Sequence, residues 1–241
     1  MEESIDDLLE MLDADRSELA EDAQHALIAL GSQVVEPLIA VVPRLGRFGQ
    51  LCAIEVFNSL GDMRPAEVLV GLLTSEDTTV RSWSAEALGD LGARRAAPAL
   101  RQAYEAWKMR AEPLGDSEAG CLRWALTQLG ARERVLPPRV AELQTGGEGP
   151  GSFWRADDLV EVINELAEHQ QAVLGFLIWR TRRDGGLSWV SGPDLDWEVD
   201  RALPWARTVA ECRDWALLAA GEFTGEMDLA AMIDWIDSSD T

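Results

Sequence analysis

The residues of this chain that could do chemistry are few, and the densest group is a run of alternating acids near residue 197. Its four carboxylates belong to Asp194, Asp196, Glu198 and Asp200. An EF-hand calcium loop begins with such an alternation, but it needs Gly at its sixth position and Glu at its twelfth. Those positions hold Val199 and Trp205, so the EF-hand motif is excluded. Three alternatives stay open: another divalent-metal site, an acidic strand that docks on a basic partner, and a solvated strand face that protects a sheet edge.

Histidine and cysteine form no catalytic or metal-binding pattern in the sequence. The two histidines, His25 and His169, have no second ligand at the spacing of a motif such as H-E-x-x-H. The cysteines at positions 52, 121 and 212 are far apart, which favours reduced, buried thiols. The glycine patterns of a nucleophile elbow, a P-loop and a dinucleotide-binding turn are missing as well. We therefore expect no catalytic residues, no metal and no cofactor.

The charge of the chain narrows the class of partner. Acids outnumber bases 43 to 21, and the formal net charge is −22. Residues 1–150 and residues 151–241 each carry −11, so neither part hides a basic patch. Such a chain repels phosphate backbones, which argues against direct binding of nucleic acid. It attracts basic proteins, although solubility alone is an equally good reason for the acidity.

The elements that must position any site are predicted by a recurring Leu-Gly pair. The pairs begin at Leu30, Leu60, Leu91 and Leu129, at spacings of 30, 31 and 38 residues. Apolar residues at helical spacing precede each pair, and the glycine stands where a helix end needs a residue tolerant of positive φ. A second apolar segment follows each glycine; the four are Val34–Val42, Ala66–Leu73, Ala96–Trp107 and Leu136–Leu143. A period of this length indicates stacked helical hairpins, that is, an α-solenoid.

The best-formed unit, Val80–Gly92 followed by Ala97–Leu100, resembles a short HEAT repeat of the type also found in phycobilisome lyases. The resemblance extends over about residues 20 to 143. It implies that Arg81 pairs with an acid of a neighbouring repeat, Asp62 or Asp77. It also implies that the second helices line a concave groove. The candidate groove residues are Glu36, Arg44, Glu67, Arg101, Gln102, Glu105 and Trp107.

The predicted fold is mainly α, with three parts. Residues 1–144 form the HEAT-like solenoid, which begins with a capping helix over residues 4–13. Residues 145–152, with four glycines and a proline, form a linker. Residues 153–241 form a small, acidic, Trp-rich α+β domain.

Within the predicted α+β domain we expect a helix over 156–169 and a β-hairpin from 172–179 and 187–190, although a helix running through residue 180 has a similar pattern. The acidic strand at 194–200 and helices over 203–221 and 226–236 follow.

Several observations together favour a cytoplasmic binding protein without enzymatic activity. No signal peptide is visible at the N-terminus, and no uninterrupted run of 18 apolar residues predicts a membrane span. Arginine outnumbers lysine 20 to 1, a bias typical of GC-rich bacterial genomes. The leading hypothesis is a binder or inhibitor of a basic protein, resembling the immunity proteins that neutralise bacterial toxins. The alternatives are a chromophore-handling or small-molecule-handling protein of the phycobilin-lyase type and a generic HEAT scaffold. A third function, a HEAT-type DNA glycosylase, conflicts with the acidity of the chain, because such an enzyme would need a basic face to bind DNA. The oligomeric state is not predicted.

Overall fold

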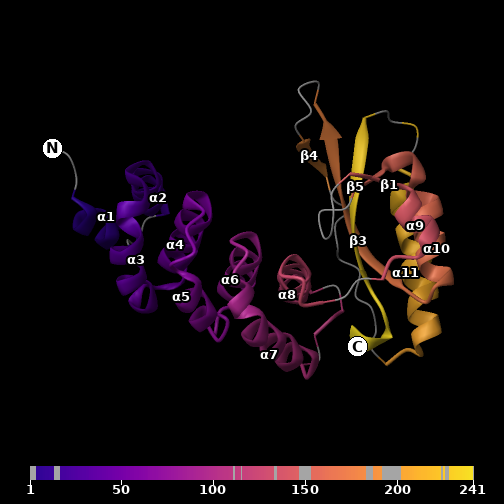
Figure 1. The fold of residues 1–241 in the computed structure, drawn as a ribbon, viewed down its shortest axis with the longest axis horizontal. Helices are drawn as coiled ribbons and strands as arrows, with labels where there is room; N and C mark the ends of the chain where they lie inside the picture. The colour runs from indigo at the N-terminus through magenta and orange to yellow at the C-terminus, as the bar shows by residue number, and fades with distance from the viewer. Residues whose placement is uncertain are drawn as a thin grey trace. The chain divides into compact units, whose positions relative to one another are not determined.

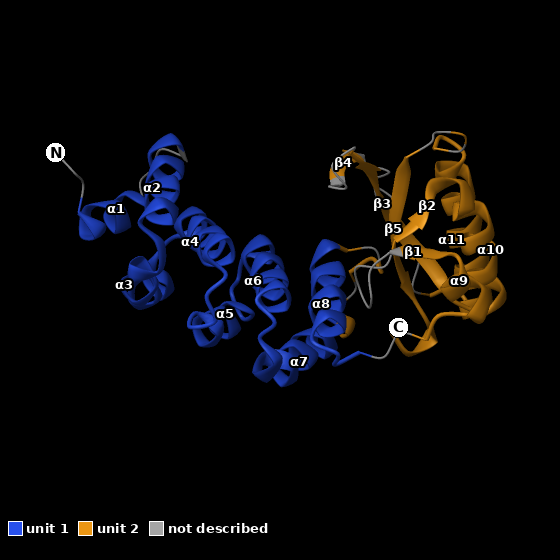
Figure 2. Ribbon diagram, turned by 45° about the horizontal axis from the view of Figure 1, so that its top comes forward, with its two compact units in different colours: residues 1–107, 117–132 blue, residues 108–116, 133–241 orange. Residues whose placement is uncertain are grey.

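The structure is a computed structural model of the chain, and it divides into two compact units. It describes residues 4–13, 17–110, 112–114, 116–132, 135–146, 153–182, 187–191, 202–223, 225 and 228–240. The first unit consists of residues 1–107 and 117–132, and the second consists of residues 108–116 and 133–241 (Figure 2).

Helical hairpins build the first unit in two rows. The first helices of the hairpins are α2 (Ser17–Leu30), α4 (Arg47–Leu60), α6 (Thr78–Asp90) and α8 (Ser117–Gln128). The second helices are α3 (Val35–Val41), α5 (Ala66–Leu72) and α7 (Ala97–Lys108). The 3₁₀ turns η1 (Gly31–Val34), η2 (Val42–Arg44) and η3 (Arg94–Ala96) adjoin the second helices. Figure 2 shows the first helices side by side in one row and the second helices in another. The predicted solenoid is confirmed.

The recurring glycine ends each first helix as the sequence predicts. Gly31, Gly61, Gly92 and Gly130 have φ angles of 77°, 61°, 67° and 65°. An L-residue with a β-carbon adopts this left-handed conformation only with strain, whereas glycine adopts it freely. The capping helix is also present as α1 (Ile5–Met11), with Ser4 and Asp7 forming a capping box.

One stretch of the first unit, Glu18–Arg44, is long and apolar enough by length and composition to cross a membrane. This finding differs from the expectation drawn from uninterrupted apolar runs, because the stretch includes isolated polar residues. In the folded unit the stretch is not one helix. The chain turns at Gly31, and α2 and α3 have 14 and 7 residues, whereas a spanning helix needs about 20.

A five-stranded antiparallel sheet forms the centre of the second unit. Its strands are β1 (Gln144–Gly146), β2 (Phe153–Arg155), β3 (Ala172–Thr181), β4 (Leu187–Ser191) and β5 (Leu229–Ile236), in the spatial order β1-β2-β5-β3-β4. Its helices are α9 (Pro138–Glu142), α10 (Leu159–Glu168) and α11 (Trp205–Ala220), and the 3₁₀ turns are η5 (Ala156–Asp158) and η6 (Ser238–Asp240). Because β2 and β3 both run antiparallel to β5, which lies between them, β2-α10-β3 is a split βαβ unit.

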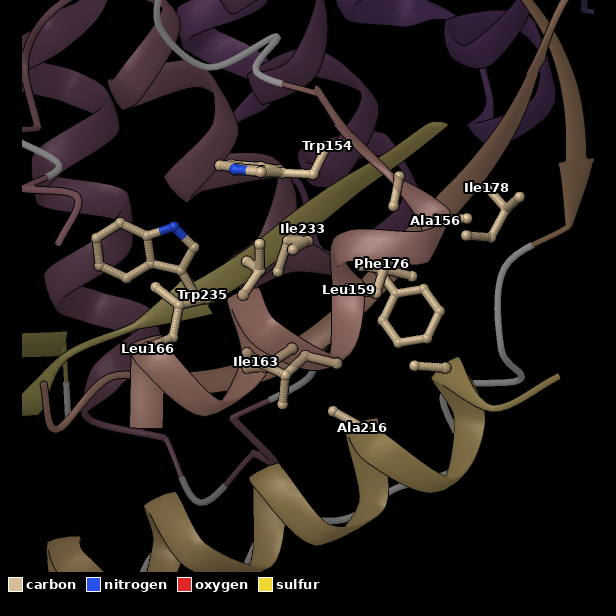
Figure 3. Close-up of a cluster of buried hydrophobic side chains, with 14 of the residues drawn as sticks. Trp154, Ala156, Leu159, Ile163, Leu166, Phe176, Ile178, Ala216, Ile233 and Trp235 are labelled. Atoms are coloured by element: carbon tan, nitrogen blue, oxygen red, sulfur yellow. The ribbon is translucent and has the colours of Figure 1, made fainter. Parts of the chain in front are cut away.

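The core of the second unit lies between the sheet and its helices, which cover one side of the sheet in Figure 1. Figure 3 shows Phe176, Ile233 and Trp235 of the sheet facing the side chains of α10 and α11. Trp154 is buried in the same cluster, and its indole Nε1 donates to the carbonyl oxygen of Val140 at 2.9 Å. The predicted α+β character of this domain, its first helix, the β-hairpin and the helix over 203–221 are confirmed.

Two predictions for this domain are wrong. Residues 229–236, expected within a helix, form β5. The alternating burial of their side chains gives the reason. Leu229, Ala231, Ile233 and Trp235 are buried while the residues between them are half-exposed, which is the period of a strand. A central place between two strands overrides the helix propensity of the Leu-Ala-Ala-Met segment.

The domain boundary also differs from the prediction. Helix α9, expected as the last solenoid helix, lies in the second unit, and its Val140 belongs to that unit's core. Thr145 and Gly146, expected in the linker, belong to strand β1. The contacts of Val140 and the β1–β2 pairing account for this difference. The remaining linker residues, 147–152, lie outside the described residues.

Candidate functional site

The predicted groove residues lie on the second helices or beside them, and all but one are exposed. The exposed ones are Glu36, Arg44, Glu67, Arg101, Gln102 and Glu105. Three of these side chains serve the solenoid itself. Glu36 Oε1 lies 3.4 Å from Arg64, Arg44 donates to the carbonyl oxygen of Ala40, and Arg101 donates to that of Ala131 at 3.0 Å. Several charged side chains of the second row are therefore already engaged in contacts with turns and helix ends of the solenoid itself.

Trp107, proposed as an exposed groove anchor, is instead part of the core. It is 0% exposed and stacks on Tyr104, with ring centroids 5.9 Å apart and an interplanar angle of 5°. Leu100, Tyr104 and Trp107 are all buried and follow the i, i+4, i+7 spacing of one helix face. That face is buried, so Trp107 does not line an exposed groove.

Arginine pairs join successive repeats, but the expected partner of Arg81 was wrong. Its guanidinium makes a two-pronged pair with Glu118, at 2.7 Å from Nε and 2.6 Å from Nη2. Both side chains are largely buried, at 12% and 4% exposed. Asp62 instead pairs with Arg64, and Asp77 pairs with Arg47. Glu118 lies in the first turn of α8, the helix that packs on α6, and this places it beside Arg81.

The two aspartates show the electrostatic signature of such structural pairs. Hydrogen bonds from Arg64 lower the pKa of Asp62. The pKa of Asp77 is lowered first by the backbone N–H of Val80, which it caps at the start of α6, and then by Arg47. These carboxylates are held in their ionised form by groups of the same chain, so they act within the solenoid.

The first helices carry a different kind of surface, which we call the first-helix ridge. It consists of the residues eight, five and one positions before each recurring leucine. The exposed or half-exposed members that define it are Asp22, His25, Ala29, Glu55, Ser59, Trp83, Glu86, Asp90, Cys121, Trp124 and Gln128. Equal positions in stacked helices lie side by side, because α2 packs on α4, α4 on α6, and α6 on α8.

Contacts between the helices confirm that the ridge is continuous from α4 to α8. Asp90 Oδ1 accepts from the indole Nε1 of Trp124 at 3.3 Å, and Asp90 Oδ2 accepts from Asn58 at 3.5 Å. Glu86 Oε2 lies 4.0 Å from Cys121 Sγ. A single aspartate thus connects three consecutive helices through neutral groups.

The carboxylates of the ridge are crowded and uncompensated. Partial burial raises the pKa of Glu86 above its ordinary value, and the neighbouring charges of Asp90 and Glu55 raise it further. Burial, with the charges of Glu21 and Glu55, also raises the pKa of the Cys52 thiol to about 11. Among the described residues, Glu55, Glu86 and Asp90 have no basic partner.

Charge is therefore divided between the two rows of the solenoid. The four first helices carry seven acids and three arginines. The three second helices with η2 and η3 carry three acids and five bases. Two of the three arginines on the first helices, Arg47 and Arg81, are engaged in the pairs between repeats. Of the two rows, the row of first helices is the acidic one, whereas the predicted groove is close to neutral.

Sequence reasoning missed the ridge, although a signal for it was present. The register of the Leu-Gly pairs shows acids at the same position, five before the leucine, in Glu55 and Glu86. The core of a solenoid does not require a charge there, so a repeated charge at one position marks a surface.

The other sequence candidates contribute no further site. The acidic run Asp194, Asp196, Glu198 and Asp200 lies outside the described residues. His169 ends α10, as expected, with Nδ1 2.8 Å from the carbonyl oxygen of Glu165. Within the described part of the chain, no group of three or more His, Cys, Asp or Glu side chains is arranged to hold a metal ion.

Comparison with known proteins identifies the repeats. Residues 50–112, which span α4 to the end of α7, match a family model described as HEAT repeats. A search of curated protein sequences gave no match. The matched segment contains two successive helical hairpins. Their left-handed glycines, at positions 61 and 92, have the same conformation as Gly31 and Gly130 elsewhere in the first unit. HEAT repeats form scaffolds for protein interaction, and the first unit of this chain is a HEAT-like repeat array.

Proposed function

We propose that this protein is a non-enzymatic, cytoplasmic binder of a basic protein partner. The observation that carries the proposal is the excess of acids over bases in the first-helix row of a HEAT-like scaffold, where Glu55, Glu86 and Asp90 have no basic partner among the described residues. A solenoid offers an extended surface, and opposite charge on two proteins speeds their encounter and fixes their orientation. The second unit is acidic as well, with 18 acids and 7 bases in residues 151–241.

The partner that fits best is a toxin that the protein neutralises, in the manner of an immunity protein. A small acidic protein can inhibit a basic enzyme simply by covering its active surface. A nuclease is a natural target of this kind, because its substrate-binding face must be positive to attract phosphate. The high acidity of both units supports this proposal, since an inhibitor that competes with nucleic acid must itself be negative.

The test is capture on the immobilised full-length chain from a lysate of the native host, followed by identification of the retained protein and by an inhibition assay. We expect a protein of net positive charge whose own activity falls when the chain is added. Its retention should weaken as salt rises from about 0.01 M to about 1 M, because the screening length falls from about 30 Å to about 3 Å. A retained partner that is acidic, or one whose binding is indifferent to salt, contradicts the proposal.

A further inference from the structure

We infer that the first-helix ridge is the docking surface of this protein and that it receives a partner face in which arginine or lysine side chains surround an apolar contact. The inference rests on the proposed function for the partner's positive charge, and it goes further by assigning the surface. The ridge residues that carry it are Glu55, Glu86 and Asp90, together with Trp83 and Trp124.

The first reason is the difference between paired and unpaired acids. On the second row, Glu36 has a guanidinium 3.4 Å away, and in the connections between repeats Asp62 and Asp77 have theirs at 2.6 and 2.7 Å. On the ridge, the contacts of Glu86 and Asp90 are a thiol, an indole N–H and an amide, all neutral. A cation supplied by a partner would therefore complete interactions on the ridge, whereas at Glu36, Asp62 and Asp77 it would have to compete with arginines already in place.

The second reason is independent of charge. Trp83 is 39% exposed, although a tryptophan of a helical solenoid has a core beside it in which to bury. It lies one helical turn before Glu86, so its ring and that carboxylate share one face of α6. Tryptophan and arginine are the residues most enriched at binding hot spots, and a guanidinium beside an indole also gains cation–π attraction.

A basic partner fits this surface better than a second copy of the chain. A second copy would bring its own row of unpaired acids, and each copy has a net charge of −22. Like charges facing one another oppose association. The same argument applies to nucleic acid and to anionic membranes, whose phosphates repel the ridge.

The ridge can be tested without the natural partner, using a fluorescent oligo-arginine peptide that contains one tryptophan. The ridge variant Glu55→Gln/Glu86→Gln is compared with the matched control Glu36→Gln/Glu67→Gln, which removes the same charge from the second row. At low salt we expect the ridge variant to bind the peptide about three- to thirtyfold more weakly, as for the loss of two exposed ion pairs. The control should stay within about twofold of the original chain. Trp83→Ala should weaken binding as well, whereas Met63→Ala, which removes an exposed apolar side chain from a turn outside the ridge, should not.

The possible outcomes distinguish failure of the proposed docking surface from failure of the proposed function. Equal losses in the ridge variant and the control would overturn the assignment of the ridge while leaving a basic partner in place. If the unaltered chain does not bind the peptide at any salt concentration, the proposed function itself fails. Sedimentation of each protein alone provides the remaining check, because a dimer that dissociates only in the ridge variant would identify a second copy as the occupant.

Discussion

Replacing Gly89 with alanine should destabilise the solenoid, although alanine is the better helix former. Gly89 lies within α6 at its closest approach to α8, and a β-carbon added there would lie 2.8 Å from the Cα of Ala125 and 3.2 Å from its Cβ. Both contacts are to atoms fixed by a helix backbone, so the relief must come from movement of the whole helix. This is overpacking in a close-packed interior.

The expected size follows from two opposing terms. Forcing a methyl group into a well-packed interface typically costs 1–3 kcal/mol, and the rigidity of the backbone at Ala125 places this site near the upper end, at about 3 kcal/mol. The helix propensity gained from glycine to alanine returns about 1 kcal/mol. The net loss of about 2 kcal/mol corresponds to a fall in Tm of roughly 6–10 °C for a unit of this size.

Gly71→Ala is the matched control. Gly71 also lies in a helix, α5, but a β-carbon there would meet nothing within 4 Å. We therefore expect this variant to gain about 0.5–1 kcal/mol from reduced backbone entropy alone. Thermal unfolding followed by far-UV circular dichroism measures both variants. A Gly89→Ala protein at least as stable as the original chain would refute the close α6–α8 packing.

Three further outcomes are expected. Glu118→Gln should cost about 3–5 kcal/mol in urea unfolding because it removes the carboxylate that makes a two-pronged pair with the largely buried guanidinium of Arg81, whereas the double variant Arg81→Met/Glu118→Leu should recover most of that loss. Glu86→Gln should stabilise the protein by about 0.2–0.5 kcal/mol at neutral pH, as for removal of a like-charge i, i+4 pair. The folded-state pKa of Glu86 is raised, so its ionised form costs stability above the ordinary pKa. The advantage of the variant should therefore disappear as the pH falls to about 4. Cys52, buried and with a pKa raised to about 11, should resist alkylation at neutral pH until the protein is unfolded, as read by mass spectrometry.

The solenoid was predictable because its two determinants are both local. A left-handed glycine and a helix-spaced apolar stripe lie within one hairpin, and each recurs at almost the same distance. The strand β5 was not predictable in this way, because its state depends on partners distant in sequence. Ile233 pairs with Phe176, and Ala231 pairs with both Ile178 and Trp154. A short apolar segment is a helix or a strand according to what lies beside it.

The surface of the solenoid was harder to predict than its fold for a related reason. Whether a charged side chain has a partner depends on contacts between repeats. The insertion between α7 and α8 also changes the sequence spacing of the repeats. Arg81 meets Glu118, 37 positions away, instead of an acid nearer in the sequence. Trp107 has the residue type of a binding anchor, but its position one turn after Tyr104 and two turns after Leu100 makes it core. Residue type alone therefore placed Trp107 on the surface, whereas its spacing places it in the core.

The two groups of acids in this unit show how structure and binding can be told apart in a repeat protein. Acids that hold the repeats together have lowered pKa values and arginine partners within 3 Å, as Asp62 and Asp77 do. Glu86 has the opposite properties, since its pKa is raised and its neighbours are Asp90 and Glu55. The ionised form of such a carboxylate does not contribute to the stability of the folded protein at neutral pH. A cation from a partner would offset the cost of this charge, so a basic partner of the kind we propose would gain more at Glu86 than at acids such as Asp62 and Asp77 that already have arginine partners.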